Sequence, residues 1–266
     1  MNVFFRELKA YQKSTFIWIA SLCTLVVVFL LMFPAFTKDV EATRAIMANL
    51  PLAVRNALDI SLQNFFTVYG FFAYLLTFAS LAGAVQAMNI GVGIISKEDS
   101  GKTVDFLLTK PISRIKVVTN KILAAVFILL LTNLIFILVA LSTAAMVSVS
   151  SFDAGLLLLI ALTLLFVQLF FLAFGILLSV LIPKIKSTIS VSLPVVFGFF
   201  VIGMLGAVIG NDNVRYICPF KFYDSNYIID HSAYDIKFLI IEAVFILLAI
   251  TASYVIYLRK DIRAVS

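Results

Sequence analysis

The chain has 266 residues, of which 63% are hydrophobic and only 13% are charged, and its formal net charge is +6. A water-soluble domain has roughly a quarter of its residues charged, and no core of this size buries so much apolar surface. The composition therefore excludes the soluble classes and predicts a protein whose solvent is mostly the lipid bilayer.

The first residues predict a basic amphipathic helix that lies in the membrane interface. Apolar residues recur at helical spacing from Met1 to Leu8, and the basic residues Arg6, Lys9 and Lys13 lie among and after them. A helix of this kind places its apolar side on the membrane and its basic side in water. An ordinary basic flank of the first span is the alternative.

Six apolar stretches are each long enough to cross the hydrocarbon layer, which takes roughly 20 helical residues. They cover residues 15–36, 66–93, 122–146, 155–182, 188–210 and 238–258. The first is too long for a cleavable signal peptide and lacks a small-residue cleavage site, so we expect it to stay as a helix. Near the end of the second, Gly91 and Gly93 predict a loosened helix. The predicted fold class is an all-α polytopic membrane protein, with residues 1–266 forming one transmembrane domain.

The connections on one side of the membrane predict short helices outside the spans. Residues 38–59 read as two helical pieces separated by Pro51. The link before the fourth span is brief, and Ser151 or Asp153 can cap its helix, so spans three and four form a hairpin. Residues 211–237 are rich in Tyr and Phe, which favour the membrane–water boundary. We expect part of this segment to re-enter toward the lipid, with an aromatic surface loop as the alternative.

The distribution of Lys and Arg predicts the orientation. Fourteen of the twenty lie in the segments at one side of the spans, including both termini, and six lie at the other. Positive residues are retained in the cytoplasm, so we expect a multi-pass protein of the cell membrane with both termini cytoplasmic. Because the basic residues flank apolar runs and form no long tract, we expect the lipid bilayer and not nucleic acid as their partner.

Metal centres and disulfide frameworks are excluded by the scarcity of suitable residues. The two cysteines are Cys23, in an apolar run, and Cys218, in a polar segment, and the only histidine is His231. Isolated thiols in such different surroundings indicate neither a paired framework nor a metal site. We therefore expect no bound metal.

A polar segment, residues 95–114, interrupts the apolar sequence between the second and third spans. A turn at Gly101 is followed by apolar positions at helical spacing within residues 104–108. Pro111 ends this short helix, and Ser113 can cap the next one. A short amphipathic helix can lie on lipid, pack against its own chain or dock on a soluble partner, and periodicity alone does not choose among these.

This segment resembles the cytoplasmic signature of ABC type-2 permeases, the membrane subunits of one class of exporter. The residues that carry the resemblance are Glu98, Gly101, Thr103, Asp105 and Leu108, followed by residues 110–114. The resemblance extends to the basic N-terminal helix, the six spans, residues 50–59 and residues 218–223. It implies that the segment contains the coupling helix that touches an ATPase subunit.

The resemblance implies ten residues for this ATPase contact. They are Glu98, Gly101, Lys102, Thr103, Val104, Asp105, Phe106, Leu107, Leu108 and Arg114. The apolar members would form the docking surface, and Glu98 and Asp105 would fix its orientation through charge-assisted hydrogen bonds. Solvated loop charges are the alternative reading of these two acids.

The expected function is that of a permease subunit and not of an enzyme. No Walker A pattern, G-x-x-x-x-G-K-[ST], occurs in the chain. We therefore expect no cofactor in this chain, with ATP and magnesium held by a separate ABC ATPase in two copies. The resemblance also implies a second permease, identical or related. An apolar path suits export of an amphipathic or hydrophobic substrate, such as a peptide, a toxin or a lipid-linked molecule, across the plasma membrane.

Two other functional classes are weighed against this one. An ion- or proton-coupled secondary carrier would use polar groups near the midplane, and the hints of these are Gln86, Asn89, Asn133 and Gln168. A membrane-embedded enzyme would need paired acids, an activated Ser or metal ligands within the spans, which are absent there.

Glu242 is the only acid within a predicted span. Intramembrane charges are usually functional, which makes Glu242 a candidate polar site. It lies about one turn from the outer end of its span, where a carboxylate can also reach headgroup water.

Overall fold

The computed structural model describes residues 3–58, 60–100, 113–148, 152–182 and 184–259. Six of its helices are long and apolar enough to cross a membrane. They are α1 (Val3–Thr37), α4 (Val68–Ser100), α6 (Arg114–Val147), α7 (Ala154–Leu181), α8 (Thr188–Ile209) and α10 (Ile236–Arg259). Long helices result because apolar sequence in lipid must satisfy every backbone N–H and C=O within the segment. The expected all-α, six-span membrane protein is confirmed.

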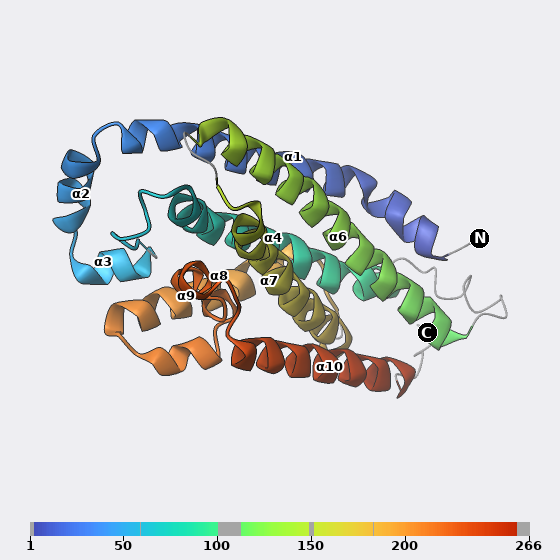
Figure 1. The fold of residues 1–266 in the computed structure, drawn as a ribbon. Helices are drawn as coiled ribbons and strands as arrows, with labels where there is room; N and C mark the ends of the chain where they lie inside the picture. Colours follow the sequence, from blue (N-terminus) through green and yellow to red (C-terminus); the bar gives the residue numbers. More distant parts are fainter. Residues whose placement is uncertain (1–2, 59, 101–112, 149–151, 183, 260–266) are drawn as a thin grey trace.

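The helices α4 and α7 form the centre of the bundle, and the other four pack around them (Figure 1). Their close approach depends on two glycines that face each other. A Cβ at Gly91 of α4 would lie 2.5 Å from the Leu172 carbonyl oxygen, and one at Gly175 of α7 would lie 2.8 Å from the Met88 carbonyl oxygen. Small residues let two backbones approach in this way. The sequence led us to expect that Gly91 loosens α4. This prediction is wrong, because Gly91 lets α4 pack tightly against α7.

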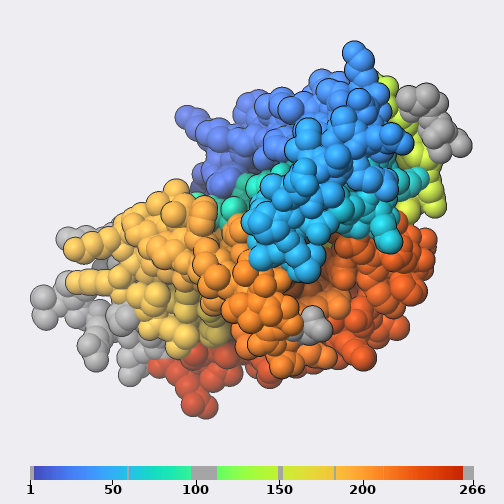
Figure 2. Space-filling model, turned by 90° about the vertical axis from the view of Figure 1, so that its left-hand side faces the viewer, coloured from blue at the N-terminus to red at the C-terminus, as the bar shows by residue number. Residues whose placement is uncertain are grey.

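The two ends of the bundle differ, and each is named here by the elements at it. The "basic end" holds the start of α1, the end of α4, the start of α6 and the end of α10 (Figure 1). The "capped end" holds the short helices α2 (Val40–Ala48), α3 (Leu52–Ala57), η1 (Asp212–Tyr216), η2 (Pro219–Lys221) and α9 (Ser225–His231). At this end α3 packs against α8, and Figure 2 shows the α2–α3 segment (light blue) over the orange part of the chain.

The N-terminal amphipathic segment is helical, but it is not separate from the first span. Residues 3–13 continue into α1 without a break, giving one helix of 35 residues. Its buried side is the line Val3, Glu7, Tyr11 and Thr15, whereas Phe5 is exposed. The side of this segment that packs on the protein is therefore the one that contains its only acid.

Local sequence signals explain where several helices begin. The Asp39 side chain accepts a hydrogen bond from Ala42 N at 3.0 Å and caps α2, and Pro51 precedes α3. Asp153 caps α7, since its Oδ1 accepts from Gly155 N at 2.7 Å. Ser113 caps α6 by accepting from Lys116 N at 3.4 Å. The expected caps at Ser113 and Asp153 and the division at Pro51 are confirmed.

Candidate functional site

Most of the expected ATPase-coupling residues lie in residues 101–112, outside the part of the chain that the structure describes. The two ends of this segment are described. Glu98 belongs to the last turn of α4, although its side chain is outside the described part, and Arg114 is the first residue of α6. Both ends therefore lie at the basic end of the bundle.

A buried ion pair joins three helices next to these ends. Lys121 of α6 is only 2% exposed, and its Nζ donates a hydrogen bond to the Ile94 carbonyl oxygen of α4 at 2.6 Å. The same Nζ lies 3.8 Å from Oε1 of Glu7 in α1, which is 8% exposed and is also 3.3 Å from Nη2 of Arg6. We call Glu7, Lys121 and the Ile94 carbonyl the "charge node".

Sequence reasoning missed the charge node. It counted Lys121 only as one of the basic residues that set orientation, and it gave Glu7 no role. One signal was present, because Glu7 lies four residues from both Val3 and Tyr11, on a single side of a helix. An acid on that side, within a basic segment, needs a cationic partner when the side is buried.

A chain of amides crosses the middle of the bundle. Asn133 Nδ2 donates to Gln168 Oε1 at 2.5 Å, and Gln168 Nε2 donates to Gln86 Oε1 at 3.2 Å. Gln86 Nε2 then donates to Thr132 Oγ1 at 3.2 Å. All four side chains are buried, and they connect α4, α6 and α7. Apart from Asn133 Oδ1, which has no partner among the described residues, their amide groups bond within this chain, which favours a structural connection between helices over a binding site.

This chain contains three of the four polar residues that hinted at a secondary carrier. The fourth, Asn89, is half-buried, and its Oδ1 has no hydrogen-bond partner among the described residues. The helices α4, α6 and α7 run through this region without a break. Carriers of the midplane type use interrupted helices at such a site, so the geometry gives that alternative no support.

Glu242 is held by the capped end and is not directed to water. It lies in the second turn of α10, is 3% exposed, and accepts a hydrogen bond from the Tyr223 hydroxyl at 2.5 Å. Burial, together with the neighbouring carboxylate, raises the pKa of the Tyr223 hydroxyl far above its ordinary value. Tyr223 therefore stays protonated and acts as the donor.

Two further contacts hold the segment after α8 against the bundle. The Tyr234 hydroxyl donates to the Leu159 carbonyl oxygen of α7 at 2.5 Å. The guanidinium of Arg215 donates to the backbone oxygen of Lys221 at 2.9 Å, and its carbon lies 4.1 Å from the centre of the Phe238 ring. The aromatic segment thus packs against α7 and α10, and its re-entry toward the lipid stays a prediction.

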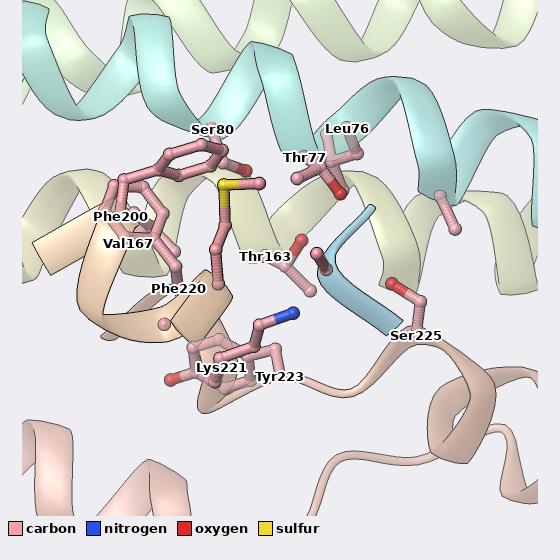
Figure 3. Close-up of a pocket in the computed structure, with 14 residues that line it drawn as sticks. Leu76, Thr77, Ser80, Thr163, Val167, Phe200, Phe220, Lys221, Tyr223 and Ser225 are labelled. Carbon is pink, nitrogen blue, oxygen red and sulfur yellow. The ribbon is translucent and has the colours of Figure 1, made fainter. Parts of the chain in front are cut away.

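A small cavity of about 40 Å³ with a mixed polar and apolar lining lies between α4, α7 and α8, under η2 (Figure 3). Its wall includes the hydroxyls of Thr77, Thr163 and Ser225, and Figure 3 shows the Lys221 side chain extending into the space between the last two. A water molecule needs about 10–15 Å³ of such space, so the cavity has room for a few waters. The sequence did not predict this cavity, because its walls come from five separate segments: α3, α4, α7, α8 and residues 220–225.

Comparison with known proteins decides the family. Residues 1–262 match the model of the ABC-2 family transporter proteins. The chain belongs to this family. No curated protein matches it.

Membership of the ABC-2 family relates the six spans and the charge node to a transporter permease. The match covers the six spans and residues 98–114, so the family resemblance inferred from the sequence is confirmed. ABC-2 permeases are membrane subunits that typically lack an ATPase of their own and work with an ABC ATPase. In this ABC-2 permease the charge node lies near the end of α4 and the start of α6, the two helices that the expected coupling segment connects.

Proposed function

We propose that the chain is the permease subunit of an ATP-driven ABC exporter of the plasma membrane. The observation that carries this proposal is the family match over residues 1–262, together with six helices suited to cross a membrane. The sequence has no Walker A pattern, so ATP and magnesium are held by a partner ATPase. The working unit contains two ATPase copies and a second permease, identical or related.

The basic end faces the cytoplasm in this proposal. Fourteen of the twenty Lys and Arg residues flank the spans at this end or belong to the termini there. The positive-inside rule then places both termini in the cytoplasm. This orientation also brings residues 98–108 and Arg114 to the side at which ATP is available.

The ATPase contact is assigned to the segment between α4 and α6. Its docking surface is formed by the apolar residues Val104, Phe106, Leu107 and Leu108. Glu98 and Asp105 orient this surface. Movement of the ATPase changes the permease only if the two make different contacts in two states, which requires a well-packed docking surface.

The exported substrate is amphipathic or hydrophobic, such as a peptide, a toxin or a lipid-linked molecule. This class is supported by the interior of the bundle, where the buried amides of α4, α6 and α7 bond to one another. Few polar groups remain to replace the hydration shell of an ion.

The test uses the tagged full-length protein, purified from its own membranes with whatever ATPase accompanies it. Leu107→Asp and Leu108→Asp are expected to insert normally but to lower permease-stimulated ATP hydrolysis in proteoliposomes by about ten-fold. Leu107→Met is the matched control, because it conserves volume and polarity. Full stimulation in both Asp variants would refute the contact. Absence of any ABC ATPase from the wild-type preparation would favour the secondary carrier.

A further inference from the structure

The charge node is an expensive feature for a membrane protein to maintain. A buried ammonium or carboxylate without a partner is strongly destabilising, and even a buried pair recovers its desolvation cost only when its hydrogen bonds are satisfied. Lys121 and Glu7 meet this requirement through each other, through the Ile94 carbonyl and through Arg6. Two apolar side chains of similar size would hold α1 and α6 together at lower cost.

The charge node lies where three membrane-spanning helices meet. Of the ion pairs between described residues, Glu7–Lys121 alone joins two membrane-spanning helices. Lys121 lies two turns after the start of α6, and Ile94 lies two turns before the end of α4. These two helices are the ones between which the family signature runs, and the node ties both to the start of α1.

We propose that Glu7 and Lys121 are positioning residues that lock the start of α1, the end of α4 and the start of α6 into one rigid body. A displacement that the ATPase delivers between α4 and α6 is then passed to α1 as well. Without the node, no ion pair between described residues links α1 to α6, and α1 follows the movement less closely. This inference rests on the proposed function, because the displacement comes from the ATPase.

Single substitutions separate folding from coupling poorly, since each leaves one charge buried. Glu7→Gln leaves the Lys121 ammonium with the Ile94 carbonyl, and Lys121→Met leaves the Glu7 carboxylate with the partly exposed Arg6. The double variant Glu7→Gln with Lys121→Met removes both charges and nearly conserves both volumes. It is expected to fold at least as well as either single variant.

The first experiment measures ATP hydrolysis by the complete complex in proteoliposomes. The double variant is expected to bind the ATPase as well as wild type but to show permease stimulation reduced about ten-fold or more. The matched control is Lys116→Met, which removes one exposed charge from the same end of α6. We expect ATPase stimulation by this variant to equal that of wild type. Normal stimulation in the double variant overturns the proposal.

The second experiment replaces the node by a covalent link. The rings of Phe4 in α1 and Phe127 in α6 have centroids 5.8 Å apart, so cysteines at these positions can be joined by a short bismaleimide once Cys23→Ala and Cys218→Ser are in place. If the helices act as one body, the link leaves stimulation intact in the otherwise unchanged protein and restores it in the double variant. Loss of stimulation on linking the unchanged protein overturns the proposal, because α1 must then move relative to α6.

The cross-linking yield also gives a readout that needs no ATPase. In the permease alone, the yield between positions 4 and 127 is expected to fall several-fold when the node is removed, because the start of α1 separates more often from α6. An unchanged yield overturns the proposal even if the ATPase is absent. A complex in which wild type itself shows no stimulation refutes the proposed function instead, and leaves the yield to decide whether the node holds the helices.

Discussion

The contact between α4 and α7 predicts a large effect for the smallest substitution in the bundle, Gly91→Ala. The added Cβ would lie 2.5 Å from the Leu172 carbonyl oxygen, 3.0 Å from Ile176 N and 3.1 Å from Gly175 Cα. All three neighbours are backbone atoms of α7, so no side chain can rotate away. Relaxing the shortest contact from 2.5 Å to the 3.4 Å of ordinary van der Waals contact separates the helices locally by 0.9 Å.

Two opposing effects determine how much Gly91→Ala changes the free energy of unfolding. Overpacking in a close-packed interior costs about 1–3 kcal/mol, and the lost helix–helix contacts add to it. The gain in helix propensity from Gly to Ala is about 1 kcal/mol. We expect Gly91→Ala to lower the free energy of unfolding by about 1–2 kcal/mol, since the overpacking term is the larger. Gly198→Ala is the matched control, because a Cβ there meets nothing within 4 Å, and it is expected to be neutral or slightly stabilising.

Reversible unfolding in mixed detergent and SDS micelles, followed by circular dichroism, measures both variants under the same conditions. Equal midpoints for Gly91→Ala and Gly198→Ala would refute the reasoning, because they would show that α4 and α7 accommodate a methyl group without separating. A larger loss for Gly91→Ala supports the close approach of the two backbones.

Two further predictions concern buried polar contacts. Gln168→Leu removes the middle of the amide chain and leaves Gln86 Oε1 without its donor. We expect this substitution to lower the free energy of unfolding by about 1–2 kcal/mol in the same micelles. The control is Ser142→Ala, which removes an exposed hydroxyl, and an equal or larger loss of stability in this control would contradict the prediction. Tyr223→Phe leaves the Glu242 carboxylate buried without its donor, whereas Glu242→Gln keeps an acceptor for the tyrosine. We therefore expect limited proteolysis to cut the segment between α8 and α10 faster in Tyr223→Phe than in Glu242→Gln. The reverse order of cleavage rates would count against the assigned hydrogen bond.

The six spans could be predicted from the sequence because each depends only on local composition. A run of about 20 apolar residues has few alternatives to a helix in lipid. The caps at Ser113 and Asp153 are local as well, since each side chain bonds to an amide within three residues. The family could be inferred from residues 98–114 because they are contiguous, whereas their contact with an ATPase stays a prediction.

Contacts between distant segments could not be predicted in this way. The charge node requires α1 and α6 to lie side by side, and a single sequence does not specify which helices are neighbours. Gly91 gave the wrong prediction for the same reason, because glycine favours both flexible helix ends and tight helix contacts, and only the position of α7 decides between them. Glu242 was identified as unusual, but its partner Tyr223 is reached only when the aromatic segment turns back.

The amide chain at the centre of the bundle also determines what the protein does not conduct. Gln86, Thr132, Asn133 and Gln168 contain no group that gains or loses a proton near neutral pH. Their hydrogen bonds run in one direction, with each amide nitrogen donating to the next oxygen. These four side chains therefore offer no titratable site at which a proton could be held on its way across the bundle.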